Sequence, residues 1–172
     1  MFAMKAGIVS DSHDCYENVL KAVEIFQTEK VDYVLHAGDI VSPRIAQLFA
    51  QVNGAEFIAV FGNCDLQKQD IRKAVEQQGG RIYDNFFAGD ICGKKIYMTH
   101  RTAVVDEIAS NGMYDMVIYG HTHARDVRKI NDCLIINPGP CMGKAGDSAG
   151  VSIVDLDNLT AGSIKFADSL RS

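Results

Sequence analysis

Two histidines separated by one residue form the most distinctive chemical motif of the chain. His121 and His123 lie in the segment Tyr119–His123, directly after the apolar run Met116–Ile118, which predicts a buried strand. Alternate side chains of an extended segment point to the same side, so both imidazoles can face one point. Imidazole is the commonest metal ligand in proteins. By itself, the motif fits a metal-binding pair and a hydrogen-bonded pair at a strand end equally well.

Four further apolar runs end in polar residues of the same kind. These residues are Asp11 and His13 after residues 6–9, Asp39 after 33–35, Asn63 after 57–61 and His100 after 96–99. In open α/β sheets, functional sites form beyond the carboxyl ends of the strands. The recurrence therefore predicts one shared site rather than scattered surface chemistry.

Together these positions form a set of seven potential metal ligands: Asp11, His13, Asp39, Asn63, His100, His121 and His123. Imidazole, carboxylate and amide oxygen suit a borderline divalent ion such as Mn, Fe, Co or Zn, and no zinc–thiolate site is needed. Seven ligands are too many for one ion with an open position, but with one bridging carboxylate they divide between two ions. Two neighbouring metals are the usual device for in-line displacement at phosphorus, which predicts hydrolysis of phosphate esters.

The elements that must position this set alternate between strand and helix in the first half of the chain. Apolar patterning predicts strands over residues 4–10, 32–36 and 56–61, and helices over 16–30, 42–53 and 69–78. Ser42 and Pro43 have the types expected of an N-cap and a first helical residue. This βαβαβα order predicts parallel strands joined by helical crossovers.

The second half is mostly β. We expect a hairpin of residues 81–91 and 94–99 turning near Gly93, a short helix over 104–110, and the strand before His121. Strands over 125–131 and 133–136, a flexible glycine-rich loop over 143–150 and a closing hairpin of 151–156 and 163–167 should follow. Residues 1–172 are thus expected to form a single α/β (α+β) domain of two mixed sheets packed face to face, with helices outside.

Composition limits the classes of partner and compartment. The net charge of −5, without a basic block, disfavours bulk binding of nucleic acid. Five scattered cysteines favour a reducing cytoplasm over a disulfide framework. No apolar run approaches the ~20 residues that span a bilayer, and no signal-peptide core is apparent, so a cytoplasmic protein without membrane contact is expected. Met4 is an alternative start, because the first strand needs nothing before it.

At these positions the sequence resembles the calcineurin-like metallophosphoesterase superfamily, and within it the small prokaryotic phosphodiesterase branch (YfcE-like proteins). The resemblance covers nearly the whole chain. It rests on a set of short motifs in a specific order: Asp11-Ser12-His13, Gly38-Asp39, Gly62-Asn63-Cys64-Asp65, His100, Gly120-His121-Thr122-His123 and Asn137-Pro138-Gly139. The family fold is a four-layer αββα sandwich.

The resemblance implies a role for each member of the set. Asp11, His13 and His123 would hold a first divalent ion, Asn63, His100 and His121 a second, and Asp39 would bridge both. A metal-bound hydroxide would attack the phosphorus of a small phosphodiester, with Asp39, Asn63 and His100 as the catalytic residues. Manganese is favoured, with nickel, cobalt, iron or zinc as alternatives. Relatives often form dimers or larger assemblies, so a homo-oligomer is one expectation.

Two positions depart from the common family pattern. Cys64 stands where many members have a histidine that can protonate the leaving group, which predicts a preference for good leaving groups such as aryl phosphodiesters. Arg101 and Thr102 follow His100 where the family commonly has Gly-His; Arg101 either contacts a phosphate oxygen or faces solvent. Loss of such a supporting histidine can cost roughly 10–100-fold in metal affinity or activity.

Several neighbouring residues have expected supporting roles. His36 should hydrogen-bond within the site rather than bind metal, Cys64 should be a neutral packed thiol, and Asp65 either orients a ligand or caps a loop. The alternative function is a protein-interaction scaffold with weak or no hydrolase activity, because a retromer subunit shares this fold. The complete set of ligand types argues against such a scaffold.

Overall fold

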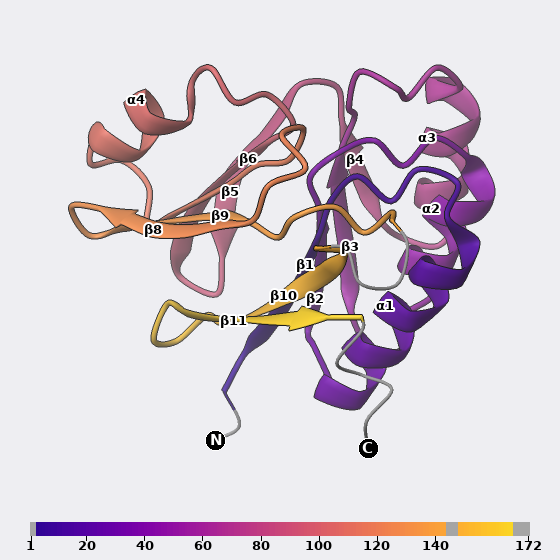
Figure 1. The fold of residues 1–172 in the computed structure, drawn as a ribbon, viewed down its shortest axis with the longest axis horizontal. Coiled ribbons are helices and arrows are strands. Elements are labelled where there is room, and N and C mark those ends of the chain that lie inside the picture. Colours follow the sequence, from indigo (N-terminus) through magenta and orange to yellow (C-terminus); the bar gives the residue numbers. More distant parts are fainter. Residues whose placement is uncertain (1–2, 144–147, 167–172) are drawn as a thin grey trace.

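The computed structural model describes residues 3–143 and 148–166. In these residues two β-sheets pack face to face, and helices cover the outer face of each (Figure 1). The layers therefore follow the order helices, sheet, sheet, helix, as the fold prediction required.

The first sheet has six strands in the order β11-β10-β1-β2-β3-β4. Its members are β1 (Lys5–Val9), β2 (Tyr33–His36), β3 (Glu56–Val60), β4 (Arg81–Tyr83), β10 (Gly150–Asp155) and β11 (Thr160–Lys165). Strands β1 to β4 pair in parallel, and β10 joins β1 antiparallel. Four parallel strands therefore end at the same edge of this sheet.

The second sheet has five strands in the order β5-β6-β7-β9-β8. Its members are β5 (Phe86–Ile91), β6 (Lys94–Thr99), β7 (Met116–Ile118), β8 (Asp126–Ile130) and β9 (Cys133–Asn137). Strands β6, β7 and β9 are parallel, whereas the edge strands β5 and β8 are antiparallel to their neighbours. Both sheets are thus mixed.

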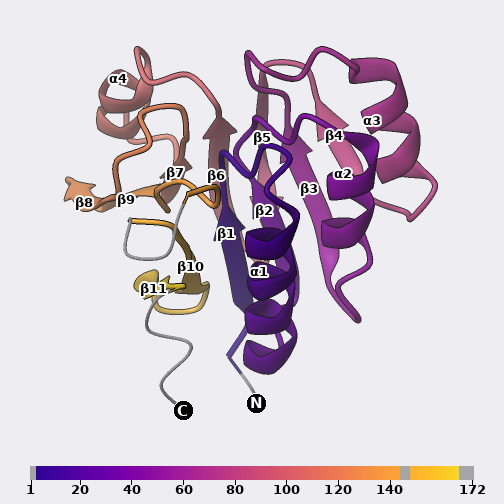
Figure 2. The same ribbon diagram turned by 45° about the vertical axis from the view of Figure 1, so that its right-hand side comes forward.

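Three apolar clusters hold the layers together. The helices α1 (Tyr16–Glu29), α2 (Pro43–Ala50) and α3 (Lys68–Glu76) cover the first sheet, with Phe26, Phe49 and Phe57 in the core between them. A second cluster fills the space between the two sheets, and a third packs α4 (Val105–Ser110) against the second sheet. Figure 2 shows α4 on the side of the molecule opposite α3. Because both faces of the central strands are covered, their sequences are almost continuously apolar.

Most predicted elements are confirmed to within a few residues. The predicted start of α2 is confirmed, since the Ser42 side chain caps the helix and Pro43 occupies its first turn. No helix in the described part of the chain is long and apolar enough to cross a membrane.

The prediction that residues 81–91 form one strand is wrong. Residues 81–83 form β4 and add in parallel to β3, whereas residues 86–91 form β5 in the other sheet. Asp84 and Asn85 carry the chain from one sheet to the other. Apolar residues flank this polar pair on both sides, and a short apolar run does not reveal which sheet it joins. The change of sheet could therefore not be predicted from the sequence.

The closing hairpin also begins its second strand earlier than predicted. Thr160 already pairs with Asp155, so the turn occupies residues 156–159 and β11 ends at Lys165. Cross-strand pairing overrides the turn-like composition of residues 160–162. The expected flexible loop over 143–150 includes residues 144–147, and the expected end of the last strand includes residue 167; these lie outside the described residues.

Candidate metal centre

The loops that follow five strands meet at one edge of the two sheets. The loop after β1 carries Asp11 and His13, the loops after β2 and β3 carry Asp39 and Asn63, and those after β6 and β7 carry the other three histidines. All seven predicted ligands are therefore brought together, although they come from both sheets. We call the group Asp11, His13 and His123 the first half of the site, and Asn63, His100 and His121 the second half.

In the first half, ligand atoms face one another without hydrogen bonds. His123 Nε2 lies 3.2 Å from Asp11 Oδ1, and the ligand atoms of Asp11, His13 and His123 all lie within 4.8 Å of one another. Asp11 Oδ1 and His13 Nε2 are buried and have no hydrogen-bond partner. A buried polar atom without a partner is costly, and a cation between these atoms would remove that cost.

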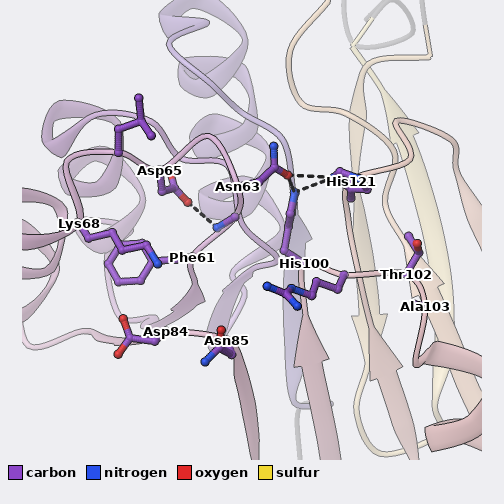
Figure 3. Close-up of a pocket in the computed structure, with 13 residues that line it drawn as sticks. Phe61, Asn63, Asp65, Lys68, Asp84, Asn85, His100, Thr102, Ala103 and His121 are labelled. Atoms are coloured by element: carbon purple, nitrogen blue, oxygen red, sulfur yellow. Dashed lines mark hydrogen bonds between the residues drawn. The ribbon is translucent and has the colours of Figure 1, made fainter.

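In the second half, one hydrogen bond determines which ring nitrogen is free. His100 Nδ1 lies 2.8 Å from the carbonyl oxygen of Ala37, which can only accept, so Nδ1 carries the proton and neutral His100 presents a lone pair at Nε2. That Nε2 lies 3.0 Å from Asn63 Oδ1 and 3.3 Å from His121 Nδ1. His121 Nδ1 is also 3.0 Å from Asn63 Oδ1 (Figure 3). Three potential lone-pair donors therefore point to one place.

Asp39 lies between the two halves. Its Oδ2 is 3.7 Å from His13 Nε2 on one side and 3.4 Å from His100 Nε2 on the other. Its Oδ1 accepts the backbone N–H of Cys64 at 2.8 Å. Burial by itself raises the pKa of Asp39, but hydrogen bonds from His100 and from Cys64 outweigh burial and hold the pKa below its usual value. The carboxylate therefore stays ionised, with one oxygen free to face both halves.

Charge and spacing in both halves fit divalent ions. Nitrogen and oxygen ligands at 2.0–2.2 Å from one ion lie about 3 to 4 Å from each other, as do the atoms of the second half and the pair His123 Nε2 and Asp11 Oδ1. Burial lowers the pKa of His100, but its hydrogen bonds to Asp39 and to Ala37 outweigh burial and raise it. A positive charge is thus favoured at this point, and either a proton or a metal ion can supply it.

The backbone of the site is held in a sparsely populated conformation. Five of the seven ligands have positive φ angles: Asp11 (50°), His13 (42°), Asp39 (58°), His121 (72°) and His123 (54°). Residues other than glycine rarely adopt this region, and such strain clusters at functional sites. The sequence offered no sign of this strain.

Two glycines allow the loops to approach closely. A Cβ atom at Gly62 would overlap the Asp39 carboxylate, and one at Gly120 would overlap the Ser10 hydroxyl. Neither glycine has a positive φ, so close approach rather than backbone freedom explains their presence. Their places directly before Asn63 and His121 follow from this packing.

Asp65 organises the loops around Asp39. Its buried carboxylate accepts backbone N–H groups from Gly62 (2.6 Å), Val41 (2.6 Å) and Asp39 (3.1 Å). The same three hydrogen bonds therefore serve both roles considered for Asp65, loop capping and ligand orientation. Burial raises the pKa of Asp65, while the hydrogen bonds from Gly62 and Val41 oppose this rise.

His36 lies beneath the site and makes only supporting contacts. Its Nδ1 accepts the N–H of Gly38 at 3.2 Å, so Nε2 carries the proton and donates to Ser12 Oγ at 2.8 Å. Burial lowers its pKa to about 3, with the charge of His100 adding to the effect, so His36 is neutral. The ring also packs edge-on against Phe49.

Two supporting residues were given no role by the sequence analysis, although Asn137 belongs to one of the family motifs. Ser10 Oγ donates to Asp11 Oδ2 at 2.5 Å, and the same oxygen accepts the N–H of His121 at 3.1 Å. Fully buried Asn137 donates to the Gly120 carbonyl and to Thr122 Oγ1, and so braces the loop between the two histidines. A buried polar residue at the end of an apolar strand was the available signal in both cases.

Cys64 lies beside the site as a thiol. Its Sγ accepts a hydrogen bond from Asn63 Nδ2 at 3.3 Å, and it forms a cluster with His13 and Asp39. Burial and the neighbouring Asp39 carboxylate raise its pKa, which keeps the thiol neutral. Cys64 is therefore a poor replacement for a protonated histidine as an acid.

A cleft of about 480 Å³ opens beside the second half only. All three residues of that half line it, together with Phe61, Leu66, Lys68, Asp84, Asn85 and the segment Arg101–Ala103 (Figure 3). None of the three residues of the first half lines it. A molecule bound in this cleft therefore meets Asn63, His100 and His121 first.

Comparisons with known proteins identify relatives of the chain and of its fold. Residues 4–159 match the calcineurin-like phosphoesterase superfamily domain. The chain is 38% identical over 157 residues to phosphodiesterase MJ0936 of Methanocaldococcus jannaschii, covering 90% of this chain and 94% of that protein. A solved archaeal phosphodiesterase superposes with a TM-score of 0.86 at 36% identity, covering 94% of this chain and 99% of that one.

The Escherichia coli phosphoesterase Yfce superposes with a TM-score of 0.73 at 19% identity, covering 96% of this chain and 94% of that one. At this identity the similarity concerns the fold alone. The family match extends over most of the chain and includes every strand end that contributes to the site. The chain therefore belongs to the calcineurin-like phosphoesterase superfamily.

Proposed function

We propose that this protein is a phosphodiesterase that works with two divalent metal ions. In this proposal Asp11, His13 and His123 hold one ion, Asn63, His100 and His121 hold the other, and Asp39 bridges them. The observation that carries the proposal is the position of Asp39 Oδ2, within 3.7 Å of His13 Nε2 and 3.4 Å of His100 Nε2. Family membership and the names of the relatives support the same activity.

When bound, two such ions supply an activated water nucleophile and neutralise charge on the phosphoryl oxygens. The residues of the chain supply position. Burial raises the pKa of Asp39, but hydrogen bonds hold it below its usual value, so the carboxylate is charged at neutral pH; the bond from the Cys64 backbone N–H goes to Oδ1, which leaves Oδ2 free. Asn63 lines the cleft beside His100 and His121; one N–H of its amide donates to Cys64 Sγ, and the other is left to meet a substrate oxygen. We therefore assign the catalytic roles to Asp39, Asn63 and His100.

The groups around the cleft favour substrates that need no proton for the leaving group. The Cys64 thiol is held neutral by a raised pKa and is not among the cleft residues. Asp65 is buried and occupied by three backbone N–H groups, and Asp84 is paired with Arg72. Without a free acid, esters of acidic phenols should react much faster than alkyl esters.

Diesters fit the site better than monoesters because of the cleft. The second ester group of a diester needs space beyond the reacting phosphorus, and the cleft of about 480 Å³ next to the second half offers that space. A monoester leaves this volume to water. We therefore place diesters of small molecules above monoesters as substrates.

The proposal includes an ion, a compartment and an assembly state. Manganese is favoured as the resident ion because the ligand set is imidazole, carboxylate and amide oxygen without thiolate; nickel, cobalt, iron and zinc are accepted by the same donors. All five cysteines are free, which supports the cytoplasm as the compartment. Homo-oligomerisation remains part of the proposal, and light scattering of the purified protein measures it.

The experiment is metal-dependent hydrolysis of bis(4-nitrophenyl) phosphate against 4-nitrophenyl phosphate. Metal-free protein receives Mn, Ni, Co, Zn or Mg in turn, and Asp39→Ala serves as the inactive control. Turnover of the diester that disappears in Asp39→Ala is expected. No turnover of either ester by protein with both ions bound would overturn the proposal and favour the protein-interaction scaffold.

A further inference from the structure

The cleft beside the second half contains positive charge that the metal ligands do not use. Lys68 and Arg101 both line it, and in the described part of the chain neither forms an ion pair with a carboxylate. The two acidic residues of the cleft are already occupied. Asp84 Oδ1 accepts from Arg72 Nη2 at 3.0 Å, and Asp65 accepts three backbone N–H groups.

The same cleft has an apolar wall that the fold does not require. Leu66 is 88% exposed, which is the largest exposure among the exposed large apolar side chains of the described chain. It lies on the rim of the cleft, close in sequence to Asn63, and it packs into none of the three apolar clusters. An exposed leucine next to unpaired cations fits a ligand with both an apolar surface and a negative charge.

Arg101 is held at a fixed place relative to the second half. Its backbone N–H donates to Thr99 Oγ1 at 3.2 Å, and Thr99 Oγ1 donates to the Asn85 carbonyl at 3.2 Å. The arginine follows His100 directly, so its backbone is anchored beside a proposed metal ligand while its side chain remains exposed. A guanidinium in this position can bind a phosphate through two parallel hydrogen bonds.

We infer that the cleft binds the second ester group of the substrate, and that Arg101 selects phosphodiesters in which this group carries a further phosphate on an apolar or aromatic framework. A nucleotide has this chemistry: Leu66 would contact its apolar part and Arg101, with Lys68 nearby, its additional phosphate. This inference rests on the proposed diester hydrolysis and adds a specificity determinant to it. The inference concerns small nucleotide esters, because the net charge of −5 disfavours bulk binding of long nucleic acids.

The experiment compares two substrates that differ in a single phosphate. These are the 4-nitrophenyl ester of thymidine 5′-phosphate and the same ester with a 3′-phosphate. We expect the Mn-loaded protein to prefer the second by about 10-fold or more in kcat/KM, because a charge-assisted contact is gained. In Arg101→Gln this ratio should fall close to one. Binding of thymidine 3′,5′-bisphosphate against thymidine 5′-phosphate, measured by calorimetry, should show the same preference and the same loss.

Two further variants distinguish the charge of Arg101 from the apolar contact of Leu66 and from a general loss of positive charge. Leu66→Ala should lower kcat/KM for both thymidine esters by about 5-fold while leaving their ratio unchanged, since only apolar contact is removed. Arg81→Gln is the matched control, because Arg81 is an exposed arginine that pairs with Glu56 and does not line the cleft. It should change neither the rates nor the ratio.

Each result has a definite meaning. A ratio near one in the wild type, or a ratio unchanged in Arg101→Gln, overturns the role of Arg101 while leaving diester hydrolysis in place. If the loaded wild type hydrolyses neither thymidine ester nor bis(4-nitrophenyl) phosphate, the proposed function fails, and this inference fails with it.

Discussion

The two halves of the candidate metal centre have similar potential ligands but differ in their surroundings. In the first half, Asp11 is fully buried, and two ligand atoms lack any hydrogen-bond partner. In the second half, Asn63, His100 and His121 face an open cleft with unpaired cations and an exposed leucine. In the proposed function the first half would therefore only hold an ion, whereas the second half would also meet the substrate.

Removing Asp39 should have the largest effect, because it belongs to both halves. Asp39→Asn keeps the shape but removes the charge, so kcat for an aryl diester should fall by about 100- to 1,000-fold. Metal content measured by mass spectrometry should fall in the same variant. Asp132→Asn, an exposed carboxylate in the turn between β8 and β9, is the control and should retain full activity. Near-normal turnover in Asp39→Asn would show that the halves do not share this residue.

Replacing either histidine of the loop after β7 by alanine should distinguish the roles of the two halves of the site. His121→Ala and His123→Ala should each weaken one ion by at least the roughly 10–100-fold that loss of a supporting partner costs. Only His121 lines the cleft, so only His121→Ala should also raise KM for diesters. Equal KM values in the two variants, measured at saturating Mn, would remove the distinction between an ion-holding half and a substrate-facing half.

Asp65 connects the loop that carries Asp39 with the loop that carries Asn63, so its removal should lower stability. Asp65→Asn replaces a carboxylate that accepts three backbone N–H groups, and the free energy of unfolding should fall by about 2 kcal/mol. Asp155 is a suitable control, because it also accepts two backbone N–H groups but is only half-buried at the end of β10. Urea denaturation should show a much smaller loss in Asp155→Asn, and equal losses would contradict the role of Asp65.

Because of His36, the free energy of unfolding should decrease in acid. Burial lowers its pKa to about 3 in the folded state, against 6.5 for the ordinary group. Between these values the unfolded chain binds a proton that the folded chain does not, so stability should fall as the pH drops below about 6.5. The contribution is about 1 kcal/mol per pH unit.

The measurement is urea denaturation of metal-free wild type and His36→Gln at pH 7 and pH 5.5. All other ionisable groups are common to both proteins, so the difference between the two pH dependences isolates His36. The loss of stability on acidification should be smaller in the variant by about 1 kcal/mol. The same loss in both proteins would mean that His36 is protonated inside the fold.

Much of the site could be predicted because its ligands follow strands in a regular way. Asp39, Asn63 and His121 each come directly after a glycine that ends an apolar run, and that pattern is visible in the sequence. The supporting residues were harder to find. Ser10 and Asn137 look like ordinary polar positions until the structure shows which carboxylate and which loop they contact.

The amino-acid sequence by itself determined the strands, the helices and the ligand types, because these follow from local periodicity and from the chemistry of single side chains. Only the tertiary structure decided where residues 81–91 divide between two sheets and which half of the site opens to a cleft. These features depend on contacts between distant parts of the chain, such as the hydrogen bond from His121 to Asp11 across 110 residues. Such pairings are selected by the packing of the whole fold, which no local pattern encodes.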